Sequence, residues 1–146
     1  MKNIGIAGFG TVGQGFFSQI NKNFKNFKVI QIAVKNVKKK RKINLKNIKV
    51  TSKVQELAIN PNIQVLVECI GGSSGAAYKL VKTAIENKKH IITANKALLA
   101  IHGNELVKLA EKNNVSISYE AAIAGGIPIV KTVRENLKYN NISKIY

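Results

Sequence analysis

The segment Gly8-Phe9-Gly10-Thr11-Val12-Gly13 decides the fold, because its three glycines follow the spacing G-x-G-x-x-G. Apolar residues 3–7 before it predict a buried strand, and residues 12–24 after it predict a helix. At such a turn the first glycine permits the tight bend, the second leaves room for a pyrophosphate, and the third lets helix and strand approach. The amino end of the helix adds free N–H groups for the phosphates. We therefore predict a dinucleotide here, whereas a plain strand-to-helix turn needs only one glycine.

Strands and helices alternate along the rest of the chain. Further strands are predicted at 27–34, 48–51, 64–70, 88–93 and 115–119, with a last strand starting at 142–146. Helices are predicted at 53–59, 74–87, 97–113 and 128–137. This order is typical of an α/β protein of the Rossmann type, in which helices cover both faces of a mainly parallel, doubly wound sheet. Its ligand crevice lies at the carboxyl ends of the strands.

Composition fits one globular domain with a real core. The chain has 146 residues, of which 45% are hydrophobic. Its single cysteine, Cys69, excludes an internal disulfide framework. No apolar run is long enough to span a bilayer, and the amino end carries no signal-peptide pattern. These features predict a cytoplasmic protein without a membrane partner.

The formal net charge of +17 has two interpretations. A basic surface can bind nucleic acid. Lysine, asparagine and isoleucine are all abundant, however, and the only arginines are Arg41 and Arg134, although arginine suits phosphate better than lysine does. We therefore favour compositional bias. A nucleic-acid-binding protein that uses the basic segment 35–42 remains the alternative, and it would bind DNA or RNA that NADPH does not displace.

The end of the second predicted strand indicates which dinucleotide binds. An NAD site usually has an acid there, about 20 residues after the glycines, to hold the ribose hydroxyls. This chain has Lys35 instead, and six of the eight residues 35–42 are basic. Such a cluster attracts a 2′-phosphate, so we predict NADP in preference to NAD. A merely solvated loop remains the alternative for Lys39, Lys40 and Lys42.

Four segments together resemble the N-terminal half of homoserine dehydrogenase. The resemblance runs over nearly the whole chain, and the third and fourth segments are its specific part. The segments are Gly8-Phe-Gly-Thr-Val-Gly13, Val65-Leu-Val-Glu-Cys-Ile-Gly-Gly72, Ile92-Thr-Ala-Asn-Lys-Ala-Leu-Leu-Ala100 and Tyr119-Glu-Ala-Ala-Ile-Ala-Gly-Gly-Ile-Pro128. Another Rossmann semialdehyde dehydrogenase stays open as an alternative, although the fourth segment argues against it.

The resemblance implies an activity and a set of cofactor contacts. The family interconverts L-homoserine and L-aspartate 4-semialdehyde with NAD(P), on the route to threonine, methionine and isoleucine. By resemblance Phe9, Thr11 and Val12 line the cofactor. Gly71, Gly72 and Ser73 lie beside it at the end of the fourth strand. Lys96 reaches it near the nicotinamide.

The resemblance also implies a monovalent cation, usually sodium, at the link between two domains. Glu120 would contribute its carboxylate oxygen, while Ile123, Gly125 and Ile127 would contribute backbone carbonyls. Hard cations prefer such oxygen ligands, and an irregular glycine-rich turn leaves carbonyls free.

The family's catalytic lysine and aspartate belong to a second domain, so the resemblance places no catalytic residue in this chain. We expect residues 1–137 to form the NAD(P)-binding Rossmann domain and residues 138–146 to begin a truncated catalytic domain. Hydride transfer from an alcohol needs a base for the hydroxyl proton. The chain alone is therefore expected to bind cofactor without turning over homoserine. A homodimer is implied only for the full-length enzyme.

Several residues that could bear chemistry are assigned structural roles. His90 and His102 have no cysteine or aspartate partners that would make a zinc site. Cys69 is predicted to be a small buried apolar residue. Tyr119 is predicted to belong to the core, with a contact to substrate as the alternative. Glu68 lies in the strongest predicted strand, and its role stays open between the site and a strand-end contact.

Overall fold

A computed structural model describes residues 1–39, 41 and 43–144. The predictions for Lys40, Lys42 and the last two positions of the strand at 142–146 therefore lie outside the described residues. The strands are β1 (Lys2–Ala7), β2 (Phe27–Ala33), β3 (Lys49–Thr51), β4 (Val65–Glu68), β5 (His90–Thr93) and β6 (Ile117–Ser118). The helices are α1 (Thr11–Asn23), α2 (Gln55–Ile59), α3 (Ala76–Glu86), α4 (Lys96–Lys112), α5 (Glu120–Ile123), α6 (Ile129–Lys131) and the π-helical turn η1 (Thr132–Asn136).

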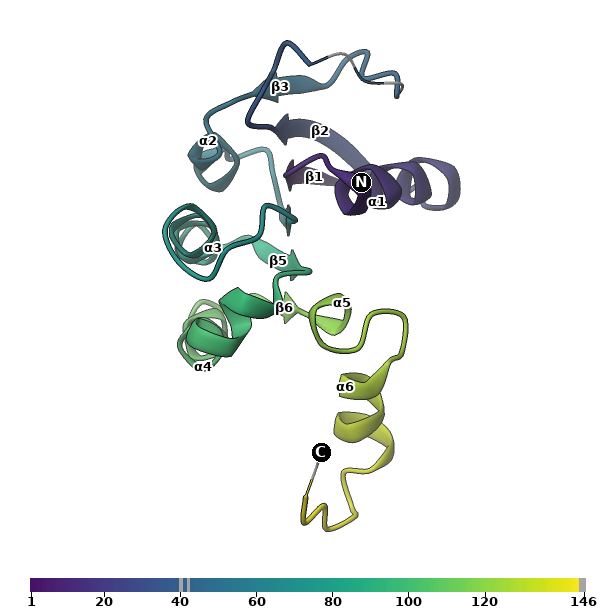
Figure 1. The fold of residues 1–146 in the computed structure, drawn as a ribbon, viewed down its shortest axis with the longest axis vertical. Helices are drawn as coiled ribbons and strands as arrows, with labels where there is room; N and C mark the ends of the chain where they lie inside the picture. Colours follow the sequence, from purple (N-terminus) through teal and green to yellow (C-terminus); the bar gives the residue numbers. More distant parts are fainter. Residues whose placement is uncertain (40, 42, 145–146) are drawn as a thin grey trace.

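All six strands form one parallel sheet in the order β3-β2-β1-β4-β5-β6. This is the strand order of the doubly wound dinucleotide-binding fold, and the order reverses between β1 and β4. Figure 1 shows the sheet edge-on through the middle of the molecule, with helices on both sides. The predicted fold class is thus confirmed, and the crevice lies at the carboxyl ends of β1 and β4.

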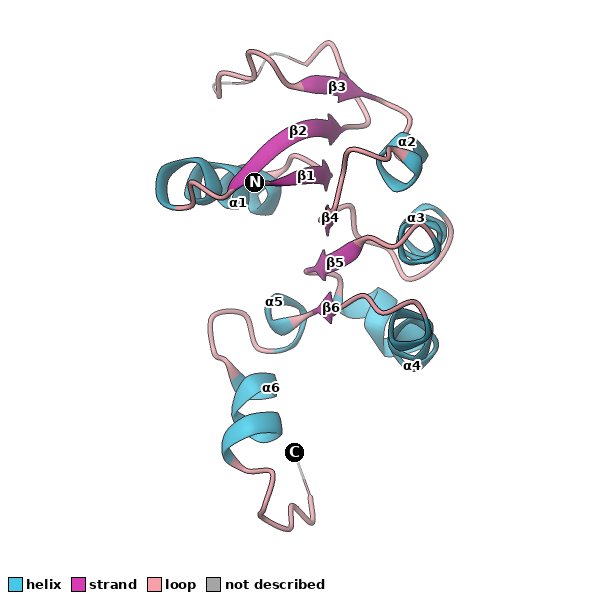
Figure 2. Cartoon of the chain, turned by 180° about the vertical axis from the view of Figure 1, so that it is seen from behind, coloured by secondary structure: helices cyan, strands magenta, loops and turns pink. Residues whose placement is uncertain are grey.

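Two apolar clusters fill the space between the sheet and its helices. The helices α2, α3 and α4 cover one face, and α1 covers β1 and β2 on the other (Figures 1 and 2). The first cluster includes Leu57, Leu80 and Leu98, which are inaccessible to solvent. The second includes Phe17, on the buried side of α1, and Ile32 of β2. Because β4 lies between the clusters, its four residues are all buried, which explains why its sequence is a continuous run rather than an alternating one.

The carboxyl-terminal part of the chain differs from its prediction in three ways. A one-turn helix, α5, forms at residues 120–123, between the predicted strand 115–119 and the glycine-rich turn that begins at Gly125, where no element was predicted. The predicted helix 128–137 becomes α6 followed by η1, because the Leu137 N–H donates to the Thr132 carbonyl five residues before it, at 3.0 Å. Residues 142–144 form no strand. This segment projects away from the sheet in Figure 1, so no strand of the described residues is placed to receive its hydrogen bonds.

A buried lysine fastens the end of the sheet opposite the crevice. Lys89 precedes β5, and only 3% of its surface is exposed. Its Nζ donates to the carbonyls of Asn60, at 2.6 Å, and Ile63, at 2.8 Å. Burial lowers the pKa of this ammonium, and the two carbonyls supply the partners that a buried cation requires.

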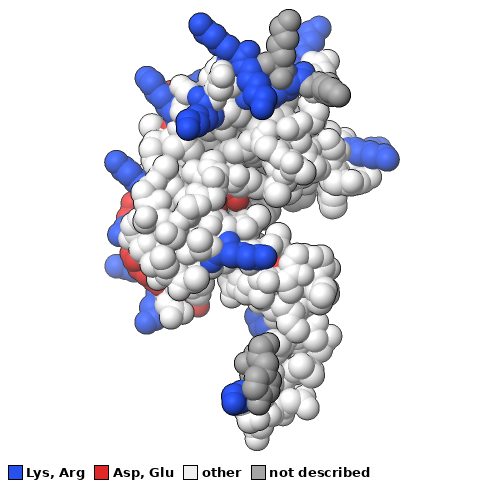
Figure 3. Space-filling view, viewed as in Figure 1, with Lys and Arg blue, Asp and Glu red and all other residues white. Residues whose placement is uncertain are grey.

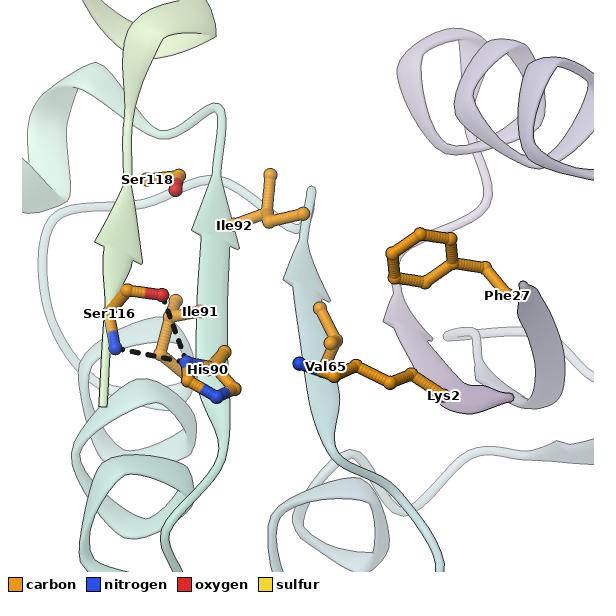
Figure 4. A pocket seen from close by; sticks show the side chains of 8 residues that line it. All are labelled: Lys2, Phe27, Val65, His90, Ile91, Ile92, Ser116 and Ser118. Atoms are coloured by element: carbon orange, nitrogen blue, oxygen red, sulfur yellow. Dashed lines mark hydrogen bonds between the residues drawn. The ribbon is translucent and has the colours of Figure 1, made fainter. Parts of the chain in front are cut away.

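A shallow trough of about 230 Å³ crosses the face of the sheet that α1 leaves uncovered. Figure 4 shows Val65 and Ile92 in the trough and Lys2, Phe27 and His90 around it. Its eight lining residues differ from those predicted to hold the cofactor. Among the described residues, no helix combines the length and apolar character that crossing a bilayer requires.

Candidate dinucleotide-binding site

A cleft of about 1220 Å³ opens at the carboxyl ends of β1, β2 and β4. The loops that follow these strands form its walls. Its lining includes five of the residues predicted to hold the cofactor, namely Gly8, Phe9, Gly10, Lys35 and Gly71. The other predicted residues, all described, lie outside this lining: Thr11, Val12, Gly13, Gly72, Ser73 and Lys96.

The three glycines of the first turn have three different structural roles. Gly8 has φ +89°, and a Cβ on it would lie 2.5 Å from the Cys69 carbonyl oxygen, so only glycine fits. A Cβ on Gly13 would collide with the Gly8 carbonyl oxygen, so this glycine lets α1 approach β1. A Cβ on Gly10 would meet nothing within 4 Å. The space beside Gly10 is therefore open to a ligand rather than filled by protein.

Of the residues between these glycines, one lies in the core and two lie at the surface. The Phe9 ring packs edge-on against Phe17, with 5.5 Å between centroids, and Phe9 is 7% exposed. Its carbonyl accepts a hydrogen bond of 3.0 Å from the Gln14 side chain, which fixes the turn from inside. Thr11 and Val12 are exposed in the first turn of α1. That helix begins at Gly10 without a side-chain cap, so its first N–H groups remain free for an anion.

A folded basic loop forms the wall of the cleft after β2. The Arg41 guanidinium donates to the carbonyls of Lys39 and Asn36, each at 2.8 Å. The Asn36 side chain accepts the Lys38 N–H at 3.0 Å. These bonds fold the loop that carries Lys38 and Lys39, and both line the cleft together with Lys35. Sequence reasoning counted Arg41 only as a charge and missed that it shapes the loop. Figure 3 shows basic side chains crowding this end of the molecule.

The buried carboxylate of Glu68 holds the turn after β4 through hydrogen bonds. Glu68 is inaccessible to solvent, and its Oε1 accepts the N–H groups of Ile70, at 2.8 Å, and Gly71, at 3.2 Å. Its Oε2 accepts the Thr93 hydroxyl at 2.6 Å. Because these donors belong to the end of β5 and to the turn after β4, Glu68 makes the strand-end contact that the sequence had left open as one of two roles.

Asn95 joins the same turn to the start of α4, a role that sequence reasoning missed. Its Oδ1 accepts the Leu98 N–H at 3.1 Å and caps the helix, while its Nδ2 donates to the Gly72 carbonyl at 2.7 Å. Its own N–H donates to the Thr93 hydroxyl oxygen at 3.1 Å. Lys96 follows as the first, exposed residue of α4. The sequence signal for the role of Asn95 was the resemblance of Thr93-Ala-Asn-Lys96 to a family motif.

Cys69 packs against the second apolar cluster as predicted, but it is only half-buried and also lines the cleft. The strand β4 ends at Glu68, and the chain therefore turns toward the cleft earlier than predicted. Burial, together with the negative charge of Glu68, raises the pKa of the Cys69 thiol to about 11. The thiol is accordingly protonated and unreactive at neutral pH.

The residues predicted to hold a cation lie around α5. The Glu120 carboxylate accepts the N–H groups of Lys131, at 2.7 Å, and Val130, at 3.3 Å, at the start of α6. The Ile127 carbonyl accepts the Ile129 N–H at 2.8 Å, and Gly125 has φ +61°. A carboxylate and carbonyls at an irregular turn suit a hard monovalent cation in donor type. Each oxygen that is already bonded keeps a second lone pair for it.

The two histidines and Tyr119 have structural surroundings. His90 Nδ1 accepts the Ser116 N–H at 3.1 Å and joins the start of β5 to the segment before β6. His102 stacks on Tyr78 with 4.2 Å between ring centroids. Tyr119 is half-buried at the start of α5 and is therefore less enclosed than predicted. Within the described residues, no group of three His, Cys, Asp or Glu side chains is placed to hold a metal.

The site as a whole fits a dinucleotide. The cleft combines a glycine turn with an open position at Gly10, an uncapped helix start and a basic wall. Phosphates prefer helix starts of this kind, and lysines attract additional phosphate charge. The crevice also lies where the strand order reverses, which is the binding position in this class of fold.

The family model and two curated relatives that match this chain belong to one family. The sequence model for the homoserine dehydrogenase NAD-binding domain matches residues 8–120. Homoserine dehydrogenase of Pseudomonas aeruginosa is 42% identical over 96% of this chain and 33% of its own length. That of Bacillus subtilis is 35% identical over 97% of this chain and 34% of its own. The chain thus spans about a third of the length of these curated relatives.

Solved structures agree with the sequence relatives. A homoserine dehydrogenase from Thiobacillus denitrificans superimposes with a TM-score of 0.86 at 37% identity, over 95% of this chain and 34% of that one. One from S. aureus gives 0.79 at 36% identity, over 86% and 33%. The family match covers most of the chain, and the relatives extend over nearly all of it. The chain therefore belongs to the homoserine dehydrogenase family and carries its NAD-binding domain.

Proposed function

We propose that this chain is the cofactor-binding part of an NADP-preferring enzyme that interconverts L-homoserine and L-aspartate 4-semialdehyde. The reaction would serve threonine, methionine and isoleucine biosynthesis in the cytoplasm, with a homodimer formed by the full-length enzyme. In this proposal residues 1–137 are the NAD(P)-binding domain, and residues 138–146 begin the catalytic domain. The observation that carries it is the single cleft that the glycine turn and Lys35 both line.

The proposed cofactor contacts follow from the position of each residue. The pyrophosphate lies against Gly8, Gly10 and the free N–H groups at the start of α1, which contains Thr11, Val12 and Gly13. The adenosine ribose lies at the end of β2, next to Lys35. The nicotinamide half extends past the end of β4, toward Gly71, Gly72, Ser73 and Lys96. When bound, the cofactor would supply the hydride-transfer chemistry.

The choice between the two nucleotides is tested at Lys35. A 2′-phosphate gains from a nearby cation, so the wild-type chain should show a larger thermal shift with NADPH than with NADH. Lys35→Glu should weaken NADPH by about tenfold or more, since one attractive charge becomes repulsive. Lys108→Glu, at an exposed position of α4 outside the cleft lining, is the charge-matched control. Equal shifts in the wild-type chain, or an NADH preference that survives in Lys35→Glu, would refute the NADP assignment.

Catalysis by these 146 residues alone is expected to be undetectable. The chain spans a third of its relatives, and no aspartate is present in it to pair with a base. The measurement is NADPH formation from L-homoserine by the purified chain, with a full-length relative as the positive control. Homoserine-dependent NADPH formation above the background of a Gly8→Val variant would contradict this expectation.

A sodium ion is proposed at Glu120, Ile123, Gly125 and Ile127. Replacing sodium by the bulky tetramethylammonium ion should lower the melting temperature of the chain, because the α5–α6 turn loses a ligand that bridges it. Glu120→Gln should remove this dependence on sodium. An identical melting temperature in both salts would reject the site.

A further inference from the structure

The turn of residues 70–73 lies on the nicotinamide side of the cleft. A doubly wound sheet binds a dinucleotide with one mononucleotide half on each side of the point where the strand order reverses. The basic loop after β2 takes the adenosine side, so the loops after β4 and β5 take the other. Gly71, at φ +74°, and Gly72, at φ +87°, place this turn in a backbone conformation that other residues rarely adopt.

Two buried side chains determine where this turn lies. Glu68 holds its beginning through the N–H groups of Ile70 and Gly71. Asn95 holds its middle through the Gly72 carbonyl at 2.7 Å. Thr93 connects the two, because its hydroxyl donates to Glu68 and accepts the Asn95 N–H. Glu68 is 0%, Thr93 1% and Asn95 6% exposed, so water does not compete for these bonds.

We propose that Asn95 and Glu68 are positioning residues that set the turn of residues 70–73 for the nicotinamide half of the cofactor. This inference rests on the proposed function. Neither side chain needs to touch the cofactor, because both act through the backbone of the turn. The glycines permit the conformation, and the hydrogen bonds from Glu68 at the end of β4 and from Asn95 at the start of α4 select it. The adenosine half, on the far side of β1, is independent of this network.

Asn95→Ser separates the positioning role from the helix cap. Serine is as good a cap as asparagine, so the hydroxyl can still accept the Leu98 N–H. It is too short to donate to the Gly72 carbonyl, so only the contact with the turn is lost. The probes are NADPH and 2′-phospho-ADP-ribose, which keeps the adenosine half and both phosphates of the bridge but lacks nicotinamide.

We expect Asn95→Ser to weaken NADPH by about tenfold while the affinity for 2′-phospho-ADP-ribose stays within about twofold of wild type. Glu68→Gln should keep NADPH affinity to within about threefold, because an amide oxygen still accepts both N–H groups. Glu68→Ala should lose that affinity as Asn95→Ser does. Lys89→Met, which perturbs the opposite end of the sheet, controls for a general loss of stability and should change neither affinity.

Different results of these titrations test the positioning role and the proposed cofactor binding. If the wild-type chain binds neither probe, the proposed function fails. If it binds both and Asn95→Ser weakens them equally, or changes neither, the positioning role is wrong. Should Glu68→Ala fail to fold, the comparison of the two probes with Asn95→Ser decides the matter alone.

Discussion

Gly10→Asp is expected to weaken cofactor binding severely while making the protein more stable. Gly10 starts α1 in extended backbone, with φ −80°, and its side-chain position is open. Aspartate is a favoured helix cap and complements the helix dipole, so the free energy of unfolding should rise by about 0.3–1 kcal/mol. The same carboxylate would lie where the pyrophosphate binds, and repulsion between like charges should cost on the order of 100-fold in affinity.

Two measurements on the Gly10→Asp protein test the predicted rise in stability and loss of affinity. Urea unfolding gives the stability, and NADPH fluorescence titration gives the affinity. Gly10→Ala is the matched variant that adds bulk without charge, and it should fall between wild type and Gly10→Asp in affinity. If Gly10→Asp binds NADPH as wild type does, the pyrophosphate does not lie at this turn.

Gly13→Ala is expected to lower the free energy of unfolding by about 1–3 kcal/mol, although alanine is the better helix former. The added methyl would collide with the backbone carbonyl of Gly8, which cannot move without displacing the end of β1. The clash therefore also shifts the glycine turn, and NADPH affinity should fall with stability. Thermal or urea unfolding measures the first effect, and the same titration measures the second.

Gly15→Ala is the control, two residues further along the same helix. Gly15 is exposed, and a Cβ there would meet nothing within 4 Å. The substitution should therefore stabilise the chain by about 0.5–1 kcal/mol through helix propensity alone. If the two variants change stability in the same direction, the close approach of α1 to β1 does not constrain Gly13.

The parts of the fold that sequence predicts well are those that local patterns determine. The apolar run of β4 and the glycine turn after β1 give fold class and crevice directly, because buried parallel strands and phosphate turns each need particular residues in sequence. Residues 142–144 and the turn α5 depend instead on their surroundings. An isoleucine-containing segment forms a strand only if a neighbouring strand accepts its hydrogen bonds, and no local pattern reports that neighbour.

The candidate site divides in the same way. Gly8, Gly10 and Lys35 could be placed in the cleft from their spacing along one βαβ unit. The contact between Glu68 and Thr93 joins residues 25 positions apart, so periodicity carries no trace of it. One signal was present nonetheless. Glu68 stands at the end of the apolar run Val65-Leu-Val-Glu68, where its carboxylate would be costly to bury without hydrogen bonds. Its position therefore predicts that hydrogen-bond donors lie nearby, although it does not identify them.

The basic loop after β2 also affects how fast a ligand arrives. A dinucleotide carries several negative charges, and the lysines that line the cleft sit on a molecule of net charge +17. Such a field steers anions during diffusion, so it raises the association rate more than it lengthens the residence time. Dissolved ions shorten its range to about 8 Å at physiological ionic strength. The speed of cofactor capture is therefore set by the salt around the protein as much as by the shape of the cleft.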